Sequence, residues 1–215
     1  MKLVLFDCDG TIVDSAAVIH ACMERTFEDF EAERPSLDLT KSIIGLTLDI
    51  AIAQMLNRPV DSEISAMTAR YKEHFMLHRQ NGGLLEPAYD GLLPLIESLA
   101  ARDDVILGVV TGKSRRGLDA ILAHHSLTKA FFTTRTADDC PSKPHPAMVL
   151  ECCAEAGIDA SQTTVIGDAI YDMQMAVSAG ARPVGVSWGY GPADALKAAG
   201  AAHVVNHAGE LAALI

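Results

Sequence analysis

The chain is predicted to fold as an α/β protein with a mainly parallel sheet. Short apolar runs typical of strands alternate with segments in which apolar residues recur at helical spacing. Most of the strand-like runs are continuously apolar, which is typical of strands covered on both faces. The expected strands are 2–6, 105–110, 130–133, 163–167, 183–186 and 203–205.

The length of the chain limits the number of domains, and its charge excludes some classes of binding partner. The 215 residues suffice for one large domain, or for a core with a small accessory domain. The formal net charge of -11 argues against nucleic-acid and anionic-membrane partners, because both require a basic surface. No apolar stretch approaches the roughly 20 residues that span a bilayer, and the first residues do not resemble a signal peptide. Five cysteines without CxxC spacing predict buried free thiols and a cytoplasmic location.

The first expected strand ends in two acids, Asp7 and Asp9. Residues two apart on an extended chain point to the same side, so both carboxylates can face one cavity while Cys8 points away. A buried strand that ends in two acids needs a compensating charge, and a divalent cation with oxygen ligands supplies it. The alternative is a surface turn with a chance second acid.

A helical insertion is expected directly after these acids. One apolar stripe comprises Ile19, Cys22, Met23, Thr26, Phe27 and Phe30, and a second comprises Ile64, Met67, Tyr71 and Phe75. Asp61 is the candidate cap of the second helix, and Asn81-Gly82-Gly83 with Pro87 marks the return. We therefore expect a core formed by residues 1–15 and 87–215, with residues 16–86 inserted.

Helix signals follow the insertion in regular order. A helix is expected over 91–101, and Ser114 has the character of an N-cap. Pro146 suits the first turn of a helix that Gly157 closes, and Gly180 closes the next one in the same way.

The second strand of the core ends at Thr111 and Gly112, where a helix begins. Three cations follow, Lys113, Arg115 and Arg116, although positive charge opposes the dipole at a helix N-terminus. Their position is explained if an anion also binds there, since free N–H groups and cations then converge on it. The alternative is an incidental basic turn.

Two later segments supply a lysine and two more acids. Pro144 and Pro146 restrict the backbone that follows Lys143, which suits a fixed contact to an anion. A further apolar run ends at Asp168, and Asp172 falls in the first helical turn after it. Each feature alone has an ordinary alternative, either a surface lysine or a helix-stabilising acid. Together they place functional residue types at three strand ends, where open α/β sheets bind ligands.

These segments give the chain a resemblance to the haloacid dehalogenase-like hydrolase superfamily over essentially its full length. The motifs DCDGT, VVTGK, SKP and GDAIYD occur in the family's order, followed by AVSAGARPVGVSWGYG, which is similar to phosphoglycolate-phosphatase-like members. The resemblance implies a Rossmann-like, doubly wound core, a small mobile helical cap formed by the insertion, and Mg²⁺ as cofactor.

The resemblance also implies roles for the acids. Asp7 is expected to be the nucleophile and a Mg²⁺ ligand. Asp9 is expected to be the general acid and base, with its backbone carbonyl on the metal. Asp168 is an expected Mg²⁺ ligand, and Asp172 a ligand or a partner of one.

The remaining site residues are expected to hold the substrate. Thr111 and the Gly112 amide correspond to the groups that bind the transferring phosphoryl group, Lys143 to the cation that neutralises it, and Lys113 is a further expected contact. In the insertion, Gly45-Leu46-Thr47 resembles the family's specificity loop, so Thr47 and Arg58 are candidate substrate contacts. The alternative is that these residues only join helices.

The expected activity is Mg²⁺-dependent hydrolysis of a small phosphorylated metabolite, such as phosphoglycolate or a sugar or nucleotide phosphate. Asp9 favours phosphoester hydrolysis, because dehalogenating and phosphonate-cleaving members lack an acid there. The two lysines expected in the insertion, Lys41 and Lys72, do not lie in the apolar setting that a Schiff-base lysine requires. The alternatives are a sugar-phosphate mutase and a non-catalytic phosphate-binding protein. A monomer and a homodimer are both compatible with the sequence.

Overall fold

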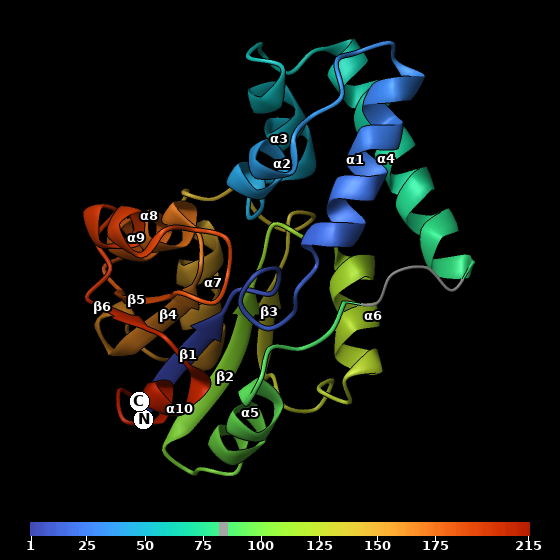
Figure 1. Ribbon diagram of the computed structural model, residues 1–215. Coiled ribbons are helices and arrows are strands. Elements are labelled where there is room, and N and C mark those ends of the chain that lie inside the picture. Colours follow the sequence, from blue (N-terminus) through green and yellow to red (C-terminus); the bar gives the residue numbers. More distant parts are fainter. Residues whose placement is uncertain (82–85) are drawn as a thin grey trace.

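A computed structural model describes residues 1–81 and 86–215. Its centre is a six-stranded sheet of order β3-β2-β1-β4-β5-β6, in which every pair is parallel (Figure 1). The strands are β1 (Lys2–Phe6), β2 (Val105–Val110), β3 (Thr133–Arg135), β4 (Thr163–Gly167), β5 (Arg182–Val186) and β6 (His203–Val205). The predicted α/β class is confirmed, and the strand order is that of a doubly wound sheet.

The predicted position of β3 was wrong. The expected run 130–133 is apolar, but the strand covers Thr133–Arg135 and pairs with Gly108–Val110 of β2. Phe131 contributes to the core from the preceding turn, where its ring meets that of Phe6 edge-on at 6.4 Å. Phe132 is 60% exposed. The apolar run 130–133 therefore marks the buried Phe131 ring that precedes the strand, and not the strand itself.

Both faces of the sheet are covered by helices. The core helices are α5 (Leu92–Ala100), α6 (Arg115–His124), α7 (Ala147–Ala156), α8 (Ile170–Ala179), α9 (Ala193–Ala198) and α10 (Ala208–Ala212). Val4 and Phe6 of β1 pack in one apolar cluster with residues of α5, α6 and α10. Leu3 and Leu5 pack on the other face with residues of α7 and α8. This alternation explains why β1 is continuously apolar.

The helix boundaries follow the local signals in the sequence. The Ser114 side chain accepts a hydrogen bond from Gly117 N at 3.2 Å, and Asp61 accepts one from Ile64 N at 2.8 Å. Gly157 and Gly180 close their helices in the left-handed conformation. These capping predictions are confirmed.

The segment after the first acids forms a separate group of helices, called here the four-helix unit. It comprises α1 (Ala16–Asp29), α2 (Leu37–Ile43), α3 (Leu48–Met55) and α4 (Ser62–Gln80). These helices share their own apolar cluster, in which Met23 and Phe27 of α1 meet Ile64 and Met67 of α4. Figure 1 shows the unit beyond one end of the sheet. The expected Gly82-Gly83 turn lies outside the described residues.

Two chain segments connect the four-helix unit to the core, and they lie side by side. Val13 and Ala88 form an antiparallel bridge. Next to it, Asp14 N donates to Pro87 O at 2.8 Å. The chain therefore leaves the core and returns to it at one place.

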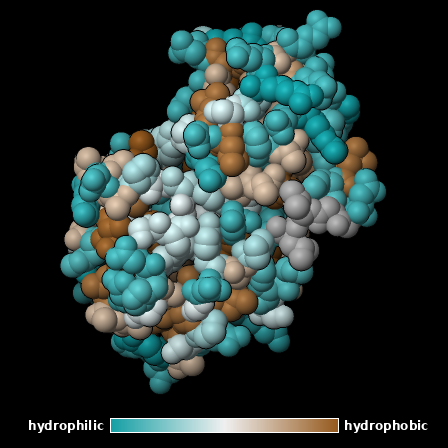
Figure 2. All heavy atoms as spheres, in the orientation of Figure 1, coloured by the Kyte–Doolittle hydropathy of each residue, from teal (hydrophilic) through white to brown (hydrophobic). Residues whose placement is uncertain are grey.

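The surface carries charge and scattered apolar residues. In the face shown in Figure 2, hydrophilic residues predominate and apolar ones are dispersed among them. None of the helices in the described part of the chain has the length and apolar character needed to cross a bilayer. All five cysteines are buried and free, as the sequence predicts.

Candidate active site

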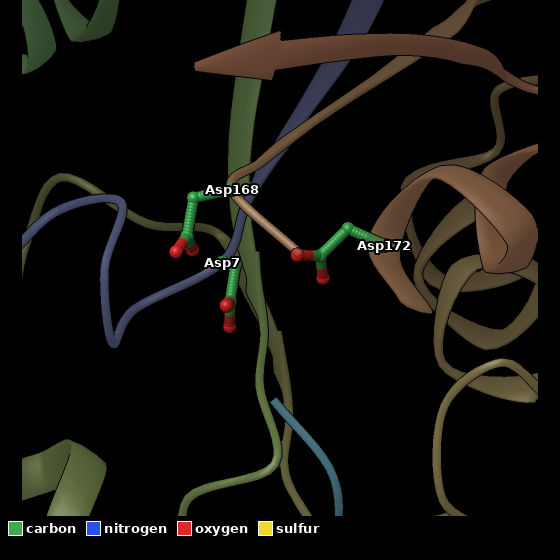
Figure 3. Close-up of side chains that lie close together, drawn as sticks. All are labelled: Asp7, Asp168 and Asp172. Carbon is green, nitrogen blue, oxygen red and sulfur yellow. The ribbon is translucent and has the colours of Figure 1, made fainter. Parts of the chain in front are cut away.

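Three acids meet at the carboxyl end of the sheet. Asp7 follows β1, Asp168 follows β4, and Asp172 lies in the first turn of α8. One carboxylate oxygen from each lies within 4.8 Å of the others, and all three residues are at most 1% exposed (Figure 3). The strand order makes β1 and β4 neighbours, which explains why acids far apart in the sequence converge.

Two glycines provide the space for these carboxylates. A side chain on Gly10, which has φ of +85°, would overlap the Asp168 carboxylate. A side chain on Gly167 would overlap that of Asp172. The glycine of DCDGT is therefore required both for its backbone conformation and for the close approach of an acid.

Lys143 is the cation of this cluster, and its side chain is completely buried. Its Nζ lies 2.8 Å from Asp7 Oδ1 and donates a hydrogen bond to Asp172 Oδ1 at 2.6 Å. Burial acts to lower the pKa of Lys143, but Asp172 and Asp7 outweigh it and the net pKa is raised. The lysine is thus held in its charged form, one cation against three acids.

Neutral donors fix two of the acids. Asp168 accepts hydrogen bonds from Thr11 Oγ1 at 3.1 Å and from Tyr190 N at 2.8 Å. Asp172 accepts one from Ala169 N at 3.0 Å, in addition to that from the lysine. Both carboxylates are therefore oriented before any ligand binds.

Asp7 differs from its neighbours because neither of its oxygens has a hydrogen-bond donor among the described residues. The charged Lys143 Nζ, 2.8 Å from Asp7 Oδ1, is its compensating partner among the described residues. Burial raises the pKa of Asp7 to about 7, with Lys143 opposing the shift and Asp172 adding to it. Burial and Asp7 likewise raise the pKa of Asp168 well above its usual value. Clustered carboxylate oxygens with too little positive charge fit a hard divalent cation such as Mg²⁺.

Asp9 lies apart from the three-acid cluster. Its Oδ1 accepts hydrogen bonds from Ser15 Oγ at 2.6 Å and from Lys113 Nζ at 2.7 Å. Lys113 also pairs with Glu86 at 3.0 Å. The structure thus separates the two acids of DCDGT, with Asp7 beside the other acids and the Asp9 carboxylate beside a lysine.

Thr111 and Gly112 lie at the end of β2. Thr111 is 1% exposed, and its Oγ1 accepts a hydrogen bond from Lys113 N at 3.2 Å. The backbone of the loop between α2 and α3 rests on Gly112. A Cβ at this position would lie 2.5 Å from Gly45 O and 2.6 Å from Leu46 O. The glycine therefore permits direct backbone contact between the core and the four-helix unit.

A cavity of about 780 Å³ lies between the four-helix unit and the core. Asp9, Gly112 and Lys113 line it from the core side. Among the described residues, the three clustered acids and Lys143 are not part of its wall, whereas Asp9, two residues after Asp7, is. The cavity is thus suited to hold the larger part of a molecule whose reacting group reaches Asp7.

The two expected contacts from the insertion have different positions. Thr47 lines the cavity, and its N donates to Ser142 Oγ at 3.0 Å, next to Lys143 in sequence. Arg58 does not line this cavity. Its guanidinium pairs with Glu63 at 2.6 Å and lies at a separate, smaller cavity of about 290 Å³. The turn after α3 directs Arg58 away from the core, so the structure does not bring it together with the other site residues.

Sequence reasoning missed Tyr190, which lies in the GVSWGYG segment. The Tyr190 hydroxyl accepts hydrogen bonds from Ser15 N at 2.9 Å and Ala16 N at 3.0 Å, and donates one to Asp14 Oδ1 at 3.0 Å. It caps α1 in place of the Ser15 side chain, which is bound to Asp9. The resemblance of this segment to the family was a signal, but it assigned no role to the tyrosine.

Comparisons with known proteins identify relatives of the whole chain. The family model described as haloacid dehalogenase-like hydrolase matches residues 4–186. The "Probable phosphatase IndB" of Dickeya dadantii is 33% identical over 92% of this chain and 86% of its own. The phosphoglycolate phosphatase of Mannheimia succiniciproducens is 29% identical over 88% of this chain and 87% of its own.

A solved structure supports the same relationship. The crystal structure of a predicted phosphatase from Clostridium acetobutylicum is 27% identical in sequence and superposes with a TM-score of 0.86. The match covers 98% of this chain and 95% of that one. The similarity therefore includes both the sheet and the four-helix unit.

Proposed function

Because the chain belongs to the haloacid dehalogenase-like hydrolase family, we propose that it is a Mg²⁺-dependent phosphatase of small organic phosphate monoesters. The observation that carries the proposal is the buried Asp7 carboxylate. It has no hydrogen-bond donor among the described residues, and it lies beside one lysine and two further acids, two residues from Asp9 in the wall of a large cavity. The names of the Dickeya and Mannheimia relatives favour the same activity.

The proposed reaction begins at Asp7. One carboxylate oxygen attacks the phosphorus atom, a bond from Asp7 to phosphorus forms, and the bond from phosphorus to the ester oxygen breaks. Lys143 reduces the repulsion between the carboxylate and the anionic substrate, since its Nζ lies 2.8 Å from Asp7. Thr111 and the Gly112 amide hold the phosphoryl oxygens at the end of β2.

Asp9 acts first as the general acid and then as the general base. It donates a proton to the departing ester oxygen, which leaves as an alcohol. It then takes a proton from the water that attacks the aspartyl-phosphate, and inorganic phosphate and free Asp7 result. Ser15 and Lys113 both bind Asp9 Oδ1, so we assign the proton to Oδ2.

Asp7, Asp168 and the Asp9 backbone carbonyl are the proposed Mg²⁺ ligands. Asp172 is proposed to support the metal ligands without binding the ion directly, because its two carboxylate oxygens already accept hydrogen bonds from Lys143 and Ala169 N. When bound, the ion supplies the positive charge that the acids lack and polarises the phosphoryl oxygens. We further propose that residues 16–86 are the family's cap, which covers the substrate and excludes water.

The experiment that tests the proposal is the Asp7→Asn substitution. We expect release of inorganic phosphate from a panel of phosphate esters with Mg²⁺ by the wild type, and loss of turnover in the variant. The control, Asp159→Asn, changes a remote acid that caps a short helix, and it should keep wild-type activity. Near-wild-type turnover by Asp7→Asn would refute the mechanism.

The same assay separates the alternatives. Incubation with a hexose 1-phosphate should yield inorganic phosphate without the isomeric sugar phosphate, whereas a mutase would yield the isomer. Inactivity of the wild type on the whole panel would favour a non-catalytic phosphate-binding protein.

A further inference from the structure

One face of α4 forms a wall of the large cavity. The lining residues at helical spacing on this face are Ser65, Thr68, Lys72, Phe75, Met76 and Arg79. The adjacent face of α4 packs against α1 through Ile64 and Met67. The helix therefore presents a mixed polar, cationic and apolar strip to the cavity and keeps its apolar strip for the four-helix unit.

Two of the cations on the cavity wall are already neutralised. Lys113 pairs with Asp9 at 2.7 Å and with Glu86 at 3.0 Å, and Arg79 pairs with Glu86 at 3.1 Å. Lys72 of α4 and Arg116 of α6 also line the cavity, but neither has a carboxylate within ion-pair distance in the part of the chain that the structure describes. The chain has a net charge of -11, so two unpaired cations that line one cavity are a local excess of positive charge.

Besides Asp9, the acids on the same wall are Asp49 and Asp138, and both are committed elsewhere. Asp49 Oδ1 accepts a hydrogen bond from Ile50 N at 2.8 Å, at the start of α3. Asp138 Oδ2 accepts one from Arg115 N at 2.7 Å, at the start of α6. Their charge is thus directed at helix N-termini, where it is stabilising. They do not neutralise Lys72 and Arg116.

Part of the cavity wall is apolar. Ile19 and Met23 of α1 line it, with Ile44 and Leu46 of the loop above Gly112. A volume of about 780 Å³ is in the range of pockets that enclose drug-sized ligands. A two-carbon phosphate would fill little of it and would leave the apolar wall in contact with water.

We propose that the substrate is an extended phosphate monoester with an apolar middle and a second anionic group at its far end, held by Lys72 and Arg116. This inference rests on the proposed phosphatase function and specifies its leaving group. The second anion is a carboxylate or a phosphate, because both offer the oxygen charge that a lysine and an arginine bind. The Thr68 hydroxyl, buried and without a partner among the described residues, is an additional donor on the same strip.

The test compares three six-carbon phosphate esters with the two-carbon phosphoglycolate. They are phosphoglycolate, phosphorylated hydroxyhexanoate, hexyl phosphate and hexanediol bisphosphate, each assayed with Mg²⁺. We expect kcat/KM to be at least about tenfold higher for phosphorylated hydroxyhexanoate or hexanediol bisphosphate than for hexyl phosphate or phosphoglycolate. The two extended anions distinguish a carboxylate preference from a phosphate preference. Equal kcat/KM for hexyl phosphate and both extended anions would overturn the inference.

Variants locate the preference on the cavity wall. Lys72→Met and Arg116→Met should each lower the ratio of kcat/KM between the preferred extended anion and hexyl phosphate about three- to tenfold. Lys129→Met removes an exposed lysine that does not line the cavity, and it should leave the ratio unchanged. An unchanged ratio in both cavity variants would show that these cations do not bind the far end.

Binding to the Asp7→Asn variant separates this inference from the proposed function. Calorimetry with the uncleaved esters should show tighter binding of the extended anion than of hexyl phosphate. If no ester is hydrolysed by the wild type, including p-nitrophenyl phosphate, the proposed function fails. If esters are hydrolysed but the extended anion has no advantage in rate or binding, only the present inference fails.

Discussion

At Asp7, burial and neighbouring charge act on a single carboxylate in opposite directions. Burial raises its pKa, Asp172 adds to the rise, and Lys143 opposes both. Asp168 shares the same surroundings and its pKa is raised as well. In the metal-free protein these acids therefore bind protons more tightly when folded than when unfolded, which links stability to pH.

We expect the metal-free protein to lose stability as the pH rises from about 4 to about 7. The folded pKa of Asp7 is about 7 and its unfolded value is 3.8, so its contribution is fully present below pH 4 and is lost as pH approaches 7. The loss is on the order of a few kcal/mol. Urea unfolding in EDTA across this range measures it, and Asp7→Asn should flatten the decline. An identical pH profile in the variant would contradict the assignment, and saturating Mg²⁺ should reverse the loss at pH 7.

At the scale of elements, the loop after β5 connects the acid cluster to the first helix of the four-helix unit. The Tyr190 backbone N binds Asp168, and its hydroxyl caps α1. One residue thus fixes a proposed metal ligand and the start of the segment that leads away from the core. The two functions use different atoms, so they can be separated by substitution.

Tyr190→Phe should lower the free energy of unfolding by about 1–2 kcal/mol, because Ser15 N–H loses its acceptor and Ala16 N–H keeps only Asp14 Oδ1, at 3.2 Å. The backbone bond to Asp168 remains, so the rise in melting temperature on adding Mg²⁺ should be preserved. Thermal and urea unfolding measure both quantities. Tyr71→Phe is the matched control, since the Tyr71 hydroxyl makes no hydrogen bond to a described residue. Equal losses in the two variants would exclude the capping role.

Local patterns predicted the elements that depend on local chemistry. The acids at the ends of β1 and β4 and the Ser114 cap follow from a few adjacent residues. The role of Tyr190 depends on a contact with Ser15, 175 residues away, and no local pattern encodes it. The path of the chain around Arg58 depends in the same way on how four short helices pack. The core motifs were therefore predictable, whereas the cavity wall was not.

At the scale of the whole molecule, the four-helix unit rests on the core through backbone contacts. Gly45 and Leu46 meet Gly112, and Thr47 N binds Ser142 Oγ at 3.0 Å. On a neighbouring part of the interface, Gln54 Nε2 donates to the Tyr171 hydroxyl at 3.1 Å. At Gly112 this contact is between main chains, which have little freedom to adapt to an added atom.

Gly112→Ala should displace the four-helix unit, since the new Cβ would lie 2.5 Å and 2.6 Å from two carbonyl oxygens. A displacement near 1 Å can lower kcat/KM about 100-fold. Small-angle scattering should show a larger radius of gyration, and kinetics the loss of activity. Gly209→Ala, where the nearest atom would be 3.5 Å from the new Cβ, is the control. An unchanged radius with reduced activity would place the effect on the phosphoryl-binding amide alone.

The antiparallel bridge between Val13 and Ala88 also has a consequence for shortening the chain. Because the chain departs and returns at adjacent positions, the four-helix unit is joined to the sheet at a single place. Joining the two ends would leave the strand order and the acids Asp7, Asp168 and Asp172 in place. A shortened chain joined at these two positions is therefore expected to keep the three-acid cluster and to lose most of the cavity wall.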